Sequence, residues 1–351
     1  MRFLYLPNET EHGDQIGPHK AFRELHRQGV ISALQSYSYL VERRRFSTHQ
    51  EALEDLLHAA EAFAPDVIFW QHLNKTYPVD RPFLRRLKEI PSRPKLVWHD
   101  PDPYGRWIKP IDSVMKAALA ECDLAIVKGT GYLMEDLRRA GARQTLYVPE
   151  SVDDERFGQP WTPTRTRPFD AIMIANLPCL KRIPFLYLPG GRSRKRTARL
   201  LHRAYGERFA LFGSGQGWQG EPYCRGPIAF NAQEPTIRQA WLSVNWSQFD
   251  RIPMYSSDRL PISLATGIPH ITNYQRGFEH VFPGAKGLYF VHSPEEVVDV
   301  ADMLLSLPRE RLIEIGCEGV EYVRRHFNAN RLYADKVTAI RERLFGAELP
   351  R

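Results

Sequence analysis

The chain has 351 residues, of which 43% are hydrophobic and 25% are charged, values that are ordinary for folded globular proteins and exclude an intrinsically disordered chain. This length exceeds the usual size of a single hydrophobic core, so two domains are expected. The formal net charge of +7 favours phosphate-bearing partners, whether a nucleotide, a nucleic acid or an anionic membrane surface, without choosing among them.

The N-terminus and the cysteines indicate the compartment. The first residues, MRFLYLPNE, lack the long apolar region of a signal peptide, and the apolar stretches elsewhere are strand-sized rather than long enough to span a bilayer. The four cysteines are scattered, which fits reduced thiols better than disulfides or a zinc site: Cys122, Cys179, Cys224 and Cys317. We therefore expect a soluble cytoplasmic protein without an obligate protein partner.

The first half of the chain alternates strand and helix patterns, as βαβ units do. Short apolar runs predict strands at residues 2–7, 66–72, 95–100, 123–129 and 144–150. Helices are predicted at residues 17–29, 50–66, 81–90, 111–120 and 131–140. The alternation predicts a parallel sheet.

The alternation stops at residues 151–170, which are rich in proline, threonine and charge and are predicted to form a linker. Strands are predicted again at residues 170–176, 208–215, 242–247 and 287–291. Helices are predicted at residues 193–204, 234–241, 294–306, 309–325 and 330–345. Residues 254–273, MYSSDRLPISLATGIPHITN, predict a short helix that leads directly into a strand.

These elements predict an α/β protein with two Rossmann-like domains facing across a cleft. We assign residues 1–155 to the N-terminal domain, residues 156–330 to the C-terminal domain and residues 331–351 to a terminal helix. Parallel sheets of this kind bind ligands outside the carboxyl ends of their strands, so the cleft is the expected site.

Polar residues open the helix in the segment 254–273. If Ser256 or Ser257 caps this helix, its free N–H groups and positive dipole end form an anion site. Arg259 would add a charge-assisted fork for a phosphate. A plain helix cap with a surface ion pair explains the same residues equally well, since capping needs no ligand.

The segment beginning at Ser256 resembles the second domain of GT-B-fold glycosyltransferases. In that family an arginine precedes a helix that ends in a small residue, glycine and proline, and a strand and a helix led by PEE follow. The segment 146–157 resembles the hinge of these enzymes, and residues 330–345 resemble their last helix, which returns to the N-terminal domain. The resemblance implies a transferase whose co-substrate is a nucleotide-diphosphate sugar, with a UDP-sugar favoured, and adds Gly213 to the donor-binding residues.

The sequence departs from this family at two positions. A glutamate that contacts the donor ribose usually stands three residues after the arginine, and a second acidic residue stands eight residues before that glutamate. Here these positions are Ile262 and Met254. The ribose contact must therefore come from elsewhere, or the site is altered or inactive.

Basic residues also gather at the start of the predicted helix 193–204. Arg192 and Arg196 are one turn apart and could grip a diphosphate together. Arg194, Lys195 and Arg199 are as readily explained by a solvated basic face. In the loop after the first strand, Gly17 marks a helix start where backbone N–H groups could approach the ligand, although a plain turn is an equal explanation.

The segment VWHDPDPYGRW, residues 97–107, places His99 and Asp100 just past a strand. Inverting sugar transfer needs a carboxylate or a histidine to accept the proton of the acceptor hydroxyl. We predict Asp100 for this role, with His99 as the second choice. Turn chemistry explains the DPDP run equally well.

The order of these features is similar to that in the DNA β-glucosyltransferases of T-even phages. Those enzymes carry a catalytic Asp after a first-domain strand, an Arg-x-x-x-Arg pair in the second domain and a later Arg at the donor helix, matched here by Asp100, Arg192 with Arg196, and Arg259. The resemblance implies a hydroxymethylated base in duplex DNA as acceptor, and the host-cell cytoplasm as the compartment of a phage-encoded enzyme. Residues 42–46 and 192–203 could supply basic surface for DNA. Four aromatic residues could stack on bases, although core packing is their more frequent fate: Trp98, Tyr104, Trp107 and Trp218.

Three alternatives remain. The acceptor could be a cell-envelope glycan or a lipid-linked molecule, because basic proteins also work at anionic membranes. A nucleotide-sugar epimerase would share the fold and the diphosphate grip. A non-catalytic scaffold would explain the missing glutamate. The DPD spacing at residues 100–102 resembles a metal-binding pair, but arginine, lysine and helix dipoles usually stabilise the diphosphate in this fold, so we expect no metal cofactor.

Overall fold

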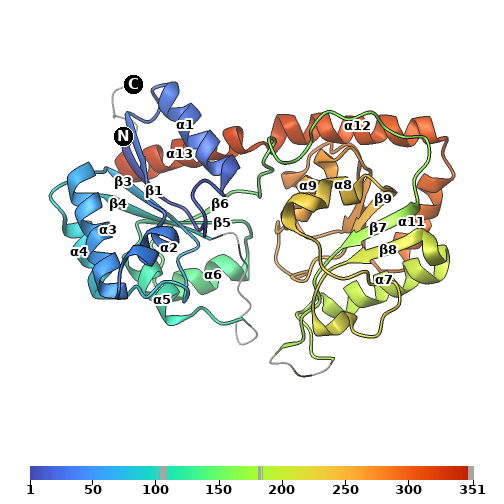
Figure 1. Ribbon diagram of the computed structural model, residues 1–351, viewed down its shortest axis with the longest axis horizontal. Coiled ribbons are helices and arrows are strands. Elements are labelled where there is room, and N and C mark those ends of the chain that lie inside the picture. The colour runs from blue at the N-terminus through green and yellow to red at the C-terminus, as the bar shows by residue number, and fades with distance from the viewer. Residues whose placement is uncertain (101, 103–108, 181–182, 184, 347–351) are drawn as a thin grey trace. The chain divides into compact units, whose positions relative to one another are not determined.

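The computed structural model describes residues 1–100, 102, 109–180, 183 and 185–346, and the chain divides into two compact units (Figure 1). Unit 1 consists of Met1–Pro149 together with Ala329–Arg351, and unit 2 consists of Glu150–Asn328. The last helix of the chain therefore belongs to the same unit as the N-terminal residues.

Unit 1 is built on a parallel sheet with the strand order β2-β1-β3-β4-β5-β6. The strands are β1 (Arg2–Leu6), β2 (Ala33–Ser36), β3 (Val67–Gln71), β4 (Lys95–Asp100), β5 (Leu124–Val127) and β6 (Thr145–Tyr147). β3 is apolar and buried along its whole length, as expected of a strand covered on both faces. The strand order reverses between β1 and β3, so the carboxyl ends of these two strands form the topological switch point.

Helices cover both faces of this sheet (Figure 1). They are α1 (Ile16–Arg27), α2 (Tyr39–Glu42), α3 (His49–Phe63), α4 (Arg81–Glu89), α5 (Ser113–Glu121), α6 (Tyr132–Arg139) and α13 (Ala329–Phe345). α3 begins with a capping box in which the backbone N–H of Glu51 donates to Thr48 and the Glu51 carboxylate accepts from the backbone of Thr48. α13 packs against α1, with the rings of Tyr333 and Phe22 edge to face and their centroids 5.1 Å apart.

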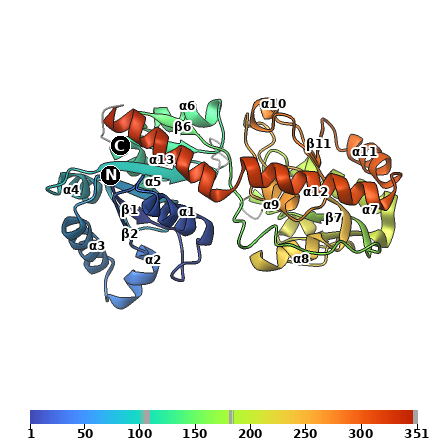
Figure 2. The same ribbon diagram turned by 90° about the horizontal axis from the view of Figure 1, so that it is seen from above.

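Unit 2 is a second parallel sheet, with the order β11-β10-β9-β7-β8. Its strands are β7 (Phe169–Ile174), β8 (Phe209–Phe212), β9 (Ala240–Asn245), β10 (His270–Asn273) and β11 (Leu288–Val291). Its helices are α7 (Gly191–Tyr205), α8 (Gln233–Ile237), α9 (Arg259–Ala265), α10 (Phe278–Val281), α11 (Glu296–Leu305) and α12 (Arg309–His326). α12 lies along this unit and packs on α9 (Figure 2). The switch point here lies between β7 and β9.

The predicted elements differ from the observed ones in three places, one of which is α10, a short helix where no element was predicted. β2 and α2 lie where no element was predicted, because β2 is a short edge strand with neither a continuous apolar run nor clear alternation. The predicted helix 234–241 is wrong in its second half, since α8 ends at Ile237 and β9 begins at Ala240. Ala240, Trp241 and Leu242 are all buried in the sheet, and a short apolar run of this kind does not distinguish a buried helix from a buried strand.

The cysteines and the lengths of the helices bear on the expected compartment. All four cysteines carry free thiols. Among the helices that the structure describes, none combines the length and the apolar character required to cross a bilayer.

Candidate functional site

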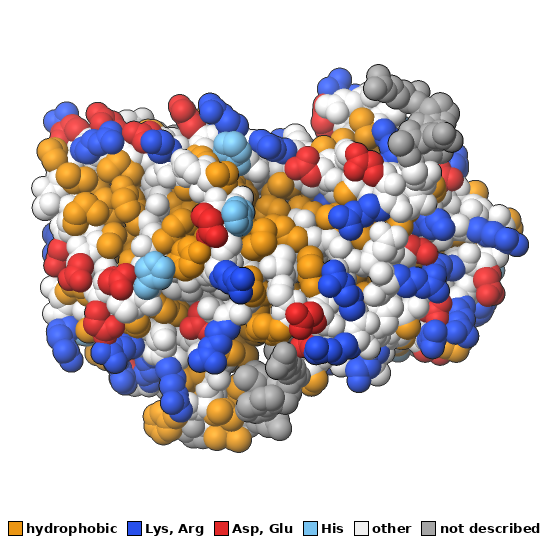
Figure 3. Space-filling view, turned by 180° about the vertical axis from the view of Figure 1, so that it is seen from behind, with side chains coloured by type: hydrophobic (Ala, Val, Ile, Leu, Met, Phe, Trp, Pro, Cys, Tyr) orange, Lys and Arg blue, Asp and Glu red, His pale blue; other side chains and the backbone are white. Residues whose placement is uncertain are grey.

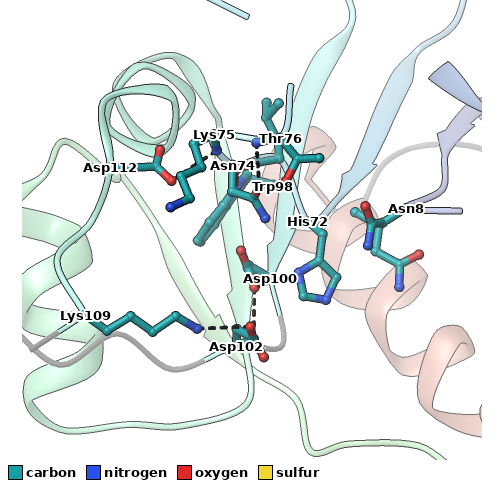
Figure 4. A network of polar contacts seen from close by, with 12 residues as sticks. Asn8, His72, Asn74, Lys75, Thr76, Trp98, Asp100, Asp102, Lys109 and Asp112 are labelled. Carbon is teal, nitrogen blue, oxygen red and sulfur yellow. Dashed lines mark hydrogen bonds and ion pairs between the residues drawn. The ribbon is translucent and has the colours of Figure 1, made fainter. Parts of the chain in front are cut away.

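Polar residues follow the carboxyl ends of the strands in the middle of the unit 1 sheet. Asn8 and Glu9 come after β1, His72 comes after β3, Asp100 ends β4 and Lys128 follows β5. Because carboxyl ends of parallel strands meet at one edge, these side chains share a neighbourhood at the switch point. Asn8, His72 and Asp100 lie together in Figure 4.

His72 and Asp100 form a pair at this edge (Figure 4). His72 Nδ1 lies 3.2 Å from Asp100 Oδ1, and the backbone N–H of His72 donates to the His99 carbonyl oxygen over 2.8 Å. Asp100 is 0% exposed, whereas the His72 side chain is 19% exposed. Asp100 therefore orients the ring through Nδ1, and Nε2 is the ring nitrogen left for a substrate proton.

His72 has an unusual backbone conformation and a shifted pKa. Its φ of 57° lies in the left-handed region, which residues other than glycine seldom adopt and which is often found at functional sites. Burial opposes protonation of the ring, but the carboxylates of Asp100 and Asp102 outweigh burial and raise the pKa of His72 above its usual value. His72 is thus a stronger base than an ordinary histidine.

Asp102 completes the group from the other side. Its backbone N–H donates to Asp100 Oδ1 over 2.8 Å, and Lys109 Nζ lies 3.0 Å from Asp102 Oδ2 (Figure 4). Burial would raise the pKa of Asp102, but Lys109, His72 and Lys128 together lower it below its usual value. Asp102 therefore stays ionised and adds negative potential around the His72 ring.

His99, the second predicted base, is a core residue. Its ring packs on Phe69 and Tyr333, with centroids 5.4 and 6.4 Å apart. Burial, reinforced by the charge of Lys336, lowers the pKa of His99 well below its usual value. A neutral imidazole enclosed by aromatic rings cannot reach an acceptor hydroxyl, so the prediction for His99 is corrected: β4 turns this side chain away from the edge, on the opposite face from the residues that flank it.

An internal carboxylate fills the predicted anion site near Gly17. Gly17 lies in the first turn of α1, and the Glu9 carboxylate accepts hydrogen bonds there from the backbone N–H of Gln15, over 3.2 Å, and from His19 Nε2, over 3.0 Å. The Ser38 hydroxyl donates to the same group. Burial would raise the pKa of Glu9, but these hydrogen bonds lower it below its usual value. The positive end of α1 is thus already neutralised, and the donor-binding role predicted for Gly17 is corrected.

In unit 2, a buried guanidinium group lies at the carboxyl edge of the sheet, within the electrostatic influence of Arg259. Arg194 Nε donates to the carbonyl oxygen of Trp246 and Arg194 Nη1 to that of Asn176, each over 2.6 Å. Asn176 follows β7 and Trp246 follows β9, so Arg194 bridges the two strands of the switch point. Burial and then the adjacent charge of Arg259 lower the pKa of Arg194 to about 9.

Arg259 lies next to this buried cation with donors to spare. Its side chain is 27% exposed, and its nearest carboxylate is Asp258, with Nη1 3.6 Å from Oδ1. Arg259 Nε and the hydroxyl of Ser257 are buried without a hydrogen-bond partner in the described part of the chain. The like charges of Arg194 and Arg259, together with the unsatisfied donors of Arg259 and Ser257, favour an anion, which would satisfy the donors and offset the repulsion.

The predicted capping role of Ser256 and Ser257 is wrong. α9 begins at Arg259, and Asp258 stands at the N-cap without a side-chain capping bond. The Ser257 carbonyl oxygen accepts from the backbone N–H of Leu260 over 3.2 Å, so a tight turn precedes the helix and places the serines ahead of its first turn. Ser256 is buried, and the Ser257 hydroxyl beside Arg259 is left as a candidate ligand contact.

The basic residues of α7 divide between two faces. Arg194 points inward, whereas Arg192 and Arg196 are exposed and line a hollow of about 540 Å³. Arg196 pairs with Glu295, and Arg259 does not line this hollow. The structure therefore does not bring Arg192, Arg196 and Arg259 together around it. The helical period explains the division, since a residue two positions along a helix is rotated by about 200°.

Gly213 has a structural explanation. A Cβ at this position would overlap the carbonyl oxygen of Ala175, because the chain after β8 passes directly against the chain after β7. The backbone N–H of Gly213 donates to the Gly226 carbonyl oxygen over 2.9 Å. Close backbone approach thus accounts for this glycine without a ligand.

Gly213→Ala is expected to lower the free energy of unfolding by about 3 kcal/mol, because backbone must shift to admit the methyl group. Urea denaturation measures this loss. The control is Gly220→Ala, where φ is 76° and a Cβ meets nothing within 4 Å. Only the unfavourable left-handed backbone conformation of the alanine should then lower the free energy of unfolding, by about 1 kcal/mol. Equal losses in the two variants would contradict the packing argument.

The two positions without acidic residues lie in ordinary surroundings. Ile262 is buried on α9, and Met254 occupies a left-handed turn with φ of 61°. A carboxylate is nevertheless present after β9: Asp250 Oδ2 lies 3.4 Å from Trp246 Nε1, and Asp250 Oδ1 is buried with no partner among the described residues. Burial raises the pKa of Asp250 above its usual value.

The predicted nucleic-acid contacts are largely accounted for by packing. Trp98 Nε1 donates to the Leu73 carbonyl oxygen over 3.1 Å, and Trp218 Nε1 to that of Ala175 over 2.7 Å, so both indoles are core groups. Tyr104 and Trp107 lie outside the described residues. In the segment 42–46, Arg45 pairs with Glu42 over 2.8 Å. Across the ranges that the structure describes, no group of three or more potential metal ligands occurs.

Sequence reasoning missed His72 and misjudged Arg194. His72 directly follows a strand, as Asp100 does, and adjacent parallel strands bring such residues together, so a signal was present. The sequence carried no such signal for Arg194. It lies two residues from Arg192 in the same basic run, and only the packing of α7 on the sheet decides which of the two arginines points inward.

Residues 192–337 match a family model described as glycosyl transferase-like. No curated protein matches the chain.

Solved structures match over nearly the whole chain. The crystal structure of HepE from Anabaena in complex with UDP and glucose has a TM-score of 0.59 at 12% identity, covering 97% of this chain and 100% of that one. Sucrose-phosphate synthase from Thermosynechococcus elongatus has a TM-score of 0.58 at 13% identity, covering 99% and 100%. The trehalose-6-phosphate synthase OtsA has a TM-score of 0.59 at 10% identity, covering 100% of both chains. The predicted α/β fold with two Rossmann-like domains is confirmed: the chain has the GT-B fold, and its residues 192–337 are similar to the glycosyl transferase-like family.

Proposed function

We propose that this protein is a glycosyltransferase that moves a sugar from a nucleotide-diphosphate donor, a UDP-sugar, to an acceptor hydroxyl. The family model over residues 192–337 supports the reaction class. The HepE structures, which hold UDP and UDP-glucose, support the donor class.

The observation that carries the proposal is the pair formed by Arg194 and Arg259. A leaving diphosphate develops negative charge as the bond to the sugar breaks, and preorganised cations stabilise that charge. Arg194 is fixed by two backbone carbonyl groups, and Arg259 keeps unsatisfied donors beside it. We assign binding of the diphosphate to Arg259 and Ser257, with the charge of the buried Arg194 adding to the attraction. We assign binding of the ribose hydroxyls to Asp250, in place of the acidic residue absent at position 262.

We assign the proton transfer to His72. In the proposed step the acceptor oxygen attacks the anomeric carbon, the bond to the diphosphate breaks with its electron pair leaving on the diphosphate, and the hydroxyl proton passes to His72 Nε2. Asp100 acts as the positioning residue: it holds the ring through Nδ1 and stabilises the imidazolium that forms. The carboxylate predicted to be the base is fully buried, whereas the ring that it orients is partly exposed.

The acceptor is proposed at the level of a hydroxyl group. A hydroxymethylated DNA base stays a prediction that no comparison supports, and a cell-envelope acceptor stays its alternative. Incubation with the donor alone separates the epimerase alternative from a transferase. An epimerase would convert the donor to a new sugar nucleotide, whereas a transferase would give at most slow hydrolysis of the donor.

Thermal unfolding in the presence of nucleoside diphosphates tests the donor assignment. UDP is expected to raise the melting temperature, because a ligand that binds only the folded state stabilises it. At one hundred times its Kd the gain is about 2.7 kcal/mol, a shift of several degrees. GDP, TDP and CDP at the same concentration are the controls for the base. If none of the four nucleotides shifts the transition, the donor class is wrong.

A further inference from the structure

One part of the unit 2 surface has no place in the proposed reaction. α7 carries no acidic residue between Gly191 and Tyr205, and three of its arginines recur at helical spacing on the exposed face: Arg196, Arg199 and Arg203. Together with Arg192, Lys195, Leu200, Phe185 and Tyr187 they line the hollow of about 540 Å³. We call these residues the α7 basic face.

The carboxylates around this face neutralise only part of it. Glu295 pairs with Arg196, and Glu221 lies 3.0 Å from Lys195 and 2.8 Å from Arg199. Arg192 and Arg203 have no ion-pair or hydrogen-bond partner within the described ranges. Five cations thus face two carboxylates. In the view from behind, Lys and Arg side chains gather along the lower left edge of the molecule, beside exposed hydrophobic side chains (Figure 3).

Bulky apolar side chains project beside these cations. Phe185 is 74% exposed and Ile183 is 49% exposed, and both belong to the loop that precedes α7. Single exposed apolar residues are common, but two of them two positions apart, next to a cationic helix face, form a mixed surface. Phe185 has a left-handed φ of 64°, which keeps this residue out of any regular element.

We propose that the α7 basic face, with Ile183 beside it, docks on an anionic membrane surface. Cations near an anionic bilayer gain electrostatic attraction, and apolar side chains beside them enter the headgroup boundary. A nucleic acid would use the same cations, and Phe185 and Tyr187 could stack on its bases. The aliphatic side chains Ile183 and Leu200, in contrast, gain free energy only by leaving water, as apolar groups do at a headgroup boundary, and this favours the membrane. This surface is independent of the donor and proton-transfer residues, so the inference does not rest on the proposed function.

Vesicle co-sedimentation with the full chain tests the docking. Vesicles of phosphatidylcholine with phosphatidylglycerol are compared with vesicles of phosphatidylcholine alone at low salt. We expect binding to the anionic vesicles only, falling as salt is raised. Binding to both vesicle types alike, or to neither, would overturn the proposal.

Two variants locate the contact. Arg199→Ala/Arg203→Ala should weaken partitioning about 25-fold, at about fivefold for each charge removed. Phe185→Ser should weaken partitioning about tenfold or more, since its ring no longer leaves water. The charge control is Arg23→Ala/Lys116→Ala, which removes two exposed cations from unit 1, and the apolar control is Met303→Ser, at 48% exposure.

Loss of binding in the α7 and Phe185 variants, with both controls near wild type, supports the docking surface. Equal loss in the double-charge control would show that net charge alone drives binding and would overturn it. A duplex DNA arm, followed by fluorescence anisotropy, gives the competing result: saturable DNA binding that the Arg199→Ala/Arg203→Ala variant loses, without vesicle binding, assigns the face to nucleic acid instead. Donor hydrolysis in solution should be unchanged in these variants, which separates this outcome from failure of the proposed function.

Discussion

Arg259→Ala is expected to abolish the stabilisation by UDP and to reduce kcat by a factor of about 100 to 1000, the usual effect of removing one preorganised donor from a developing negative charge. Arg259 is the partly exposed member of a cationic pair whose Nε lacks a partner, so its loss removes the group that reaches the ligand. The fold should survive, because the Arg259 side chain is partly exposed and its ion pair with Asp258 is a loose one, with Nη1 3.6 Å from Oδ1. Thermal unfolding with and without UDP, together with steady-state kinetics, measures both effects.

Three further arginine variants sharpen this result. Arg259→Lys keeps the charge but loses the fork, and an intermediate loss is expected. Arg196→Ala tests the diphosphate grip predicted from the sequence: a loss as large as that of Arg259→Ala would place the outer face of α7 in the donor site. Arg23→Ala, an exposed arginine of α1, is the control and should match wild type. Unchanged UDP binding by Arg259→Ala would remove the central residue of the donor assignment.

His72→Ala is expected to lower kcat by a factor of about 100 to 10,000, the range that a positioned base contributes. The pH profile carries the stronger test. His72 must be neutral to accept a proton, and its pKa lies above the ordinary value, so the wild-type rate should rise with pH through that raised pKa. The low-pH limb should vanish in His72→Ala.

Asp100→Asn separates positioning from packing. An asparagine of the same size keeps the side chain in place but removes the charge that raises the pKa of His72, so the low-pH limb should move to lower pH while the maximal rate falls. His58→Ala, an exposed histidine of α3, should leave the profile unchanged. A wild-type limb in Asp100→Asn would show that Asp100 does not act through His72.

The sequence predicted correctly those features that depend on residues close together in the chain. The continuous apolar run of β3 and the polar residue after it are visible in the sequence, because a strand buried on both faces must be apolar throughout and its end must return to water. The same logic correctly placed Asp100 at the carboxyl edge of a strand. It did not extend to the pairing of Asp100 with His72, because 28 positions separate them in sequence and only the parallel register of β3 with β4 brings them together.

The sequence by itself determined the class of this protein: alternating strands and helices in two halves, with arginines near the carboxyl edge of the second sheet. Only the tertiary structure decided which side chains act. The packing of α7 on its sheet turned Arg194 inward toward Arg259, the strand register joined His72 to Asp100, and the Glu9 carboxylate occupied the start of α1. The physical reason is that hydrophobic periodicity specifies which face of an element is buried, whereas the polar contacts of a site depend on distances between elements that local pattern does not encode.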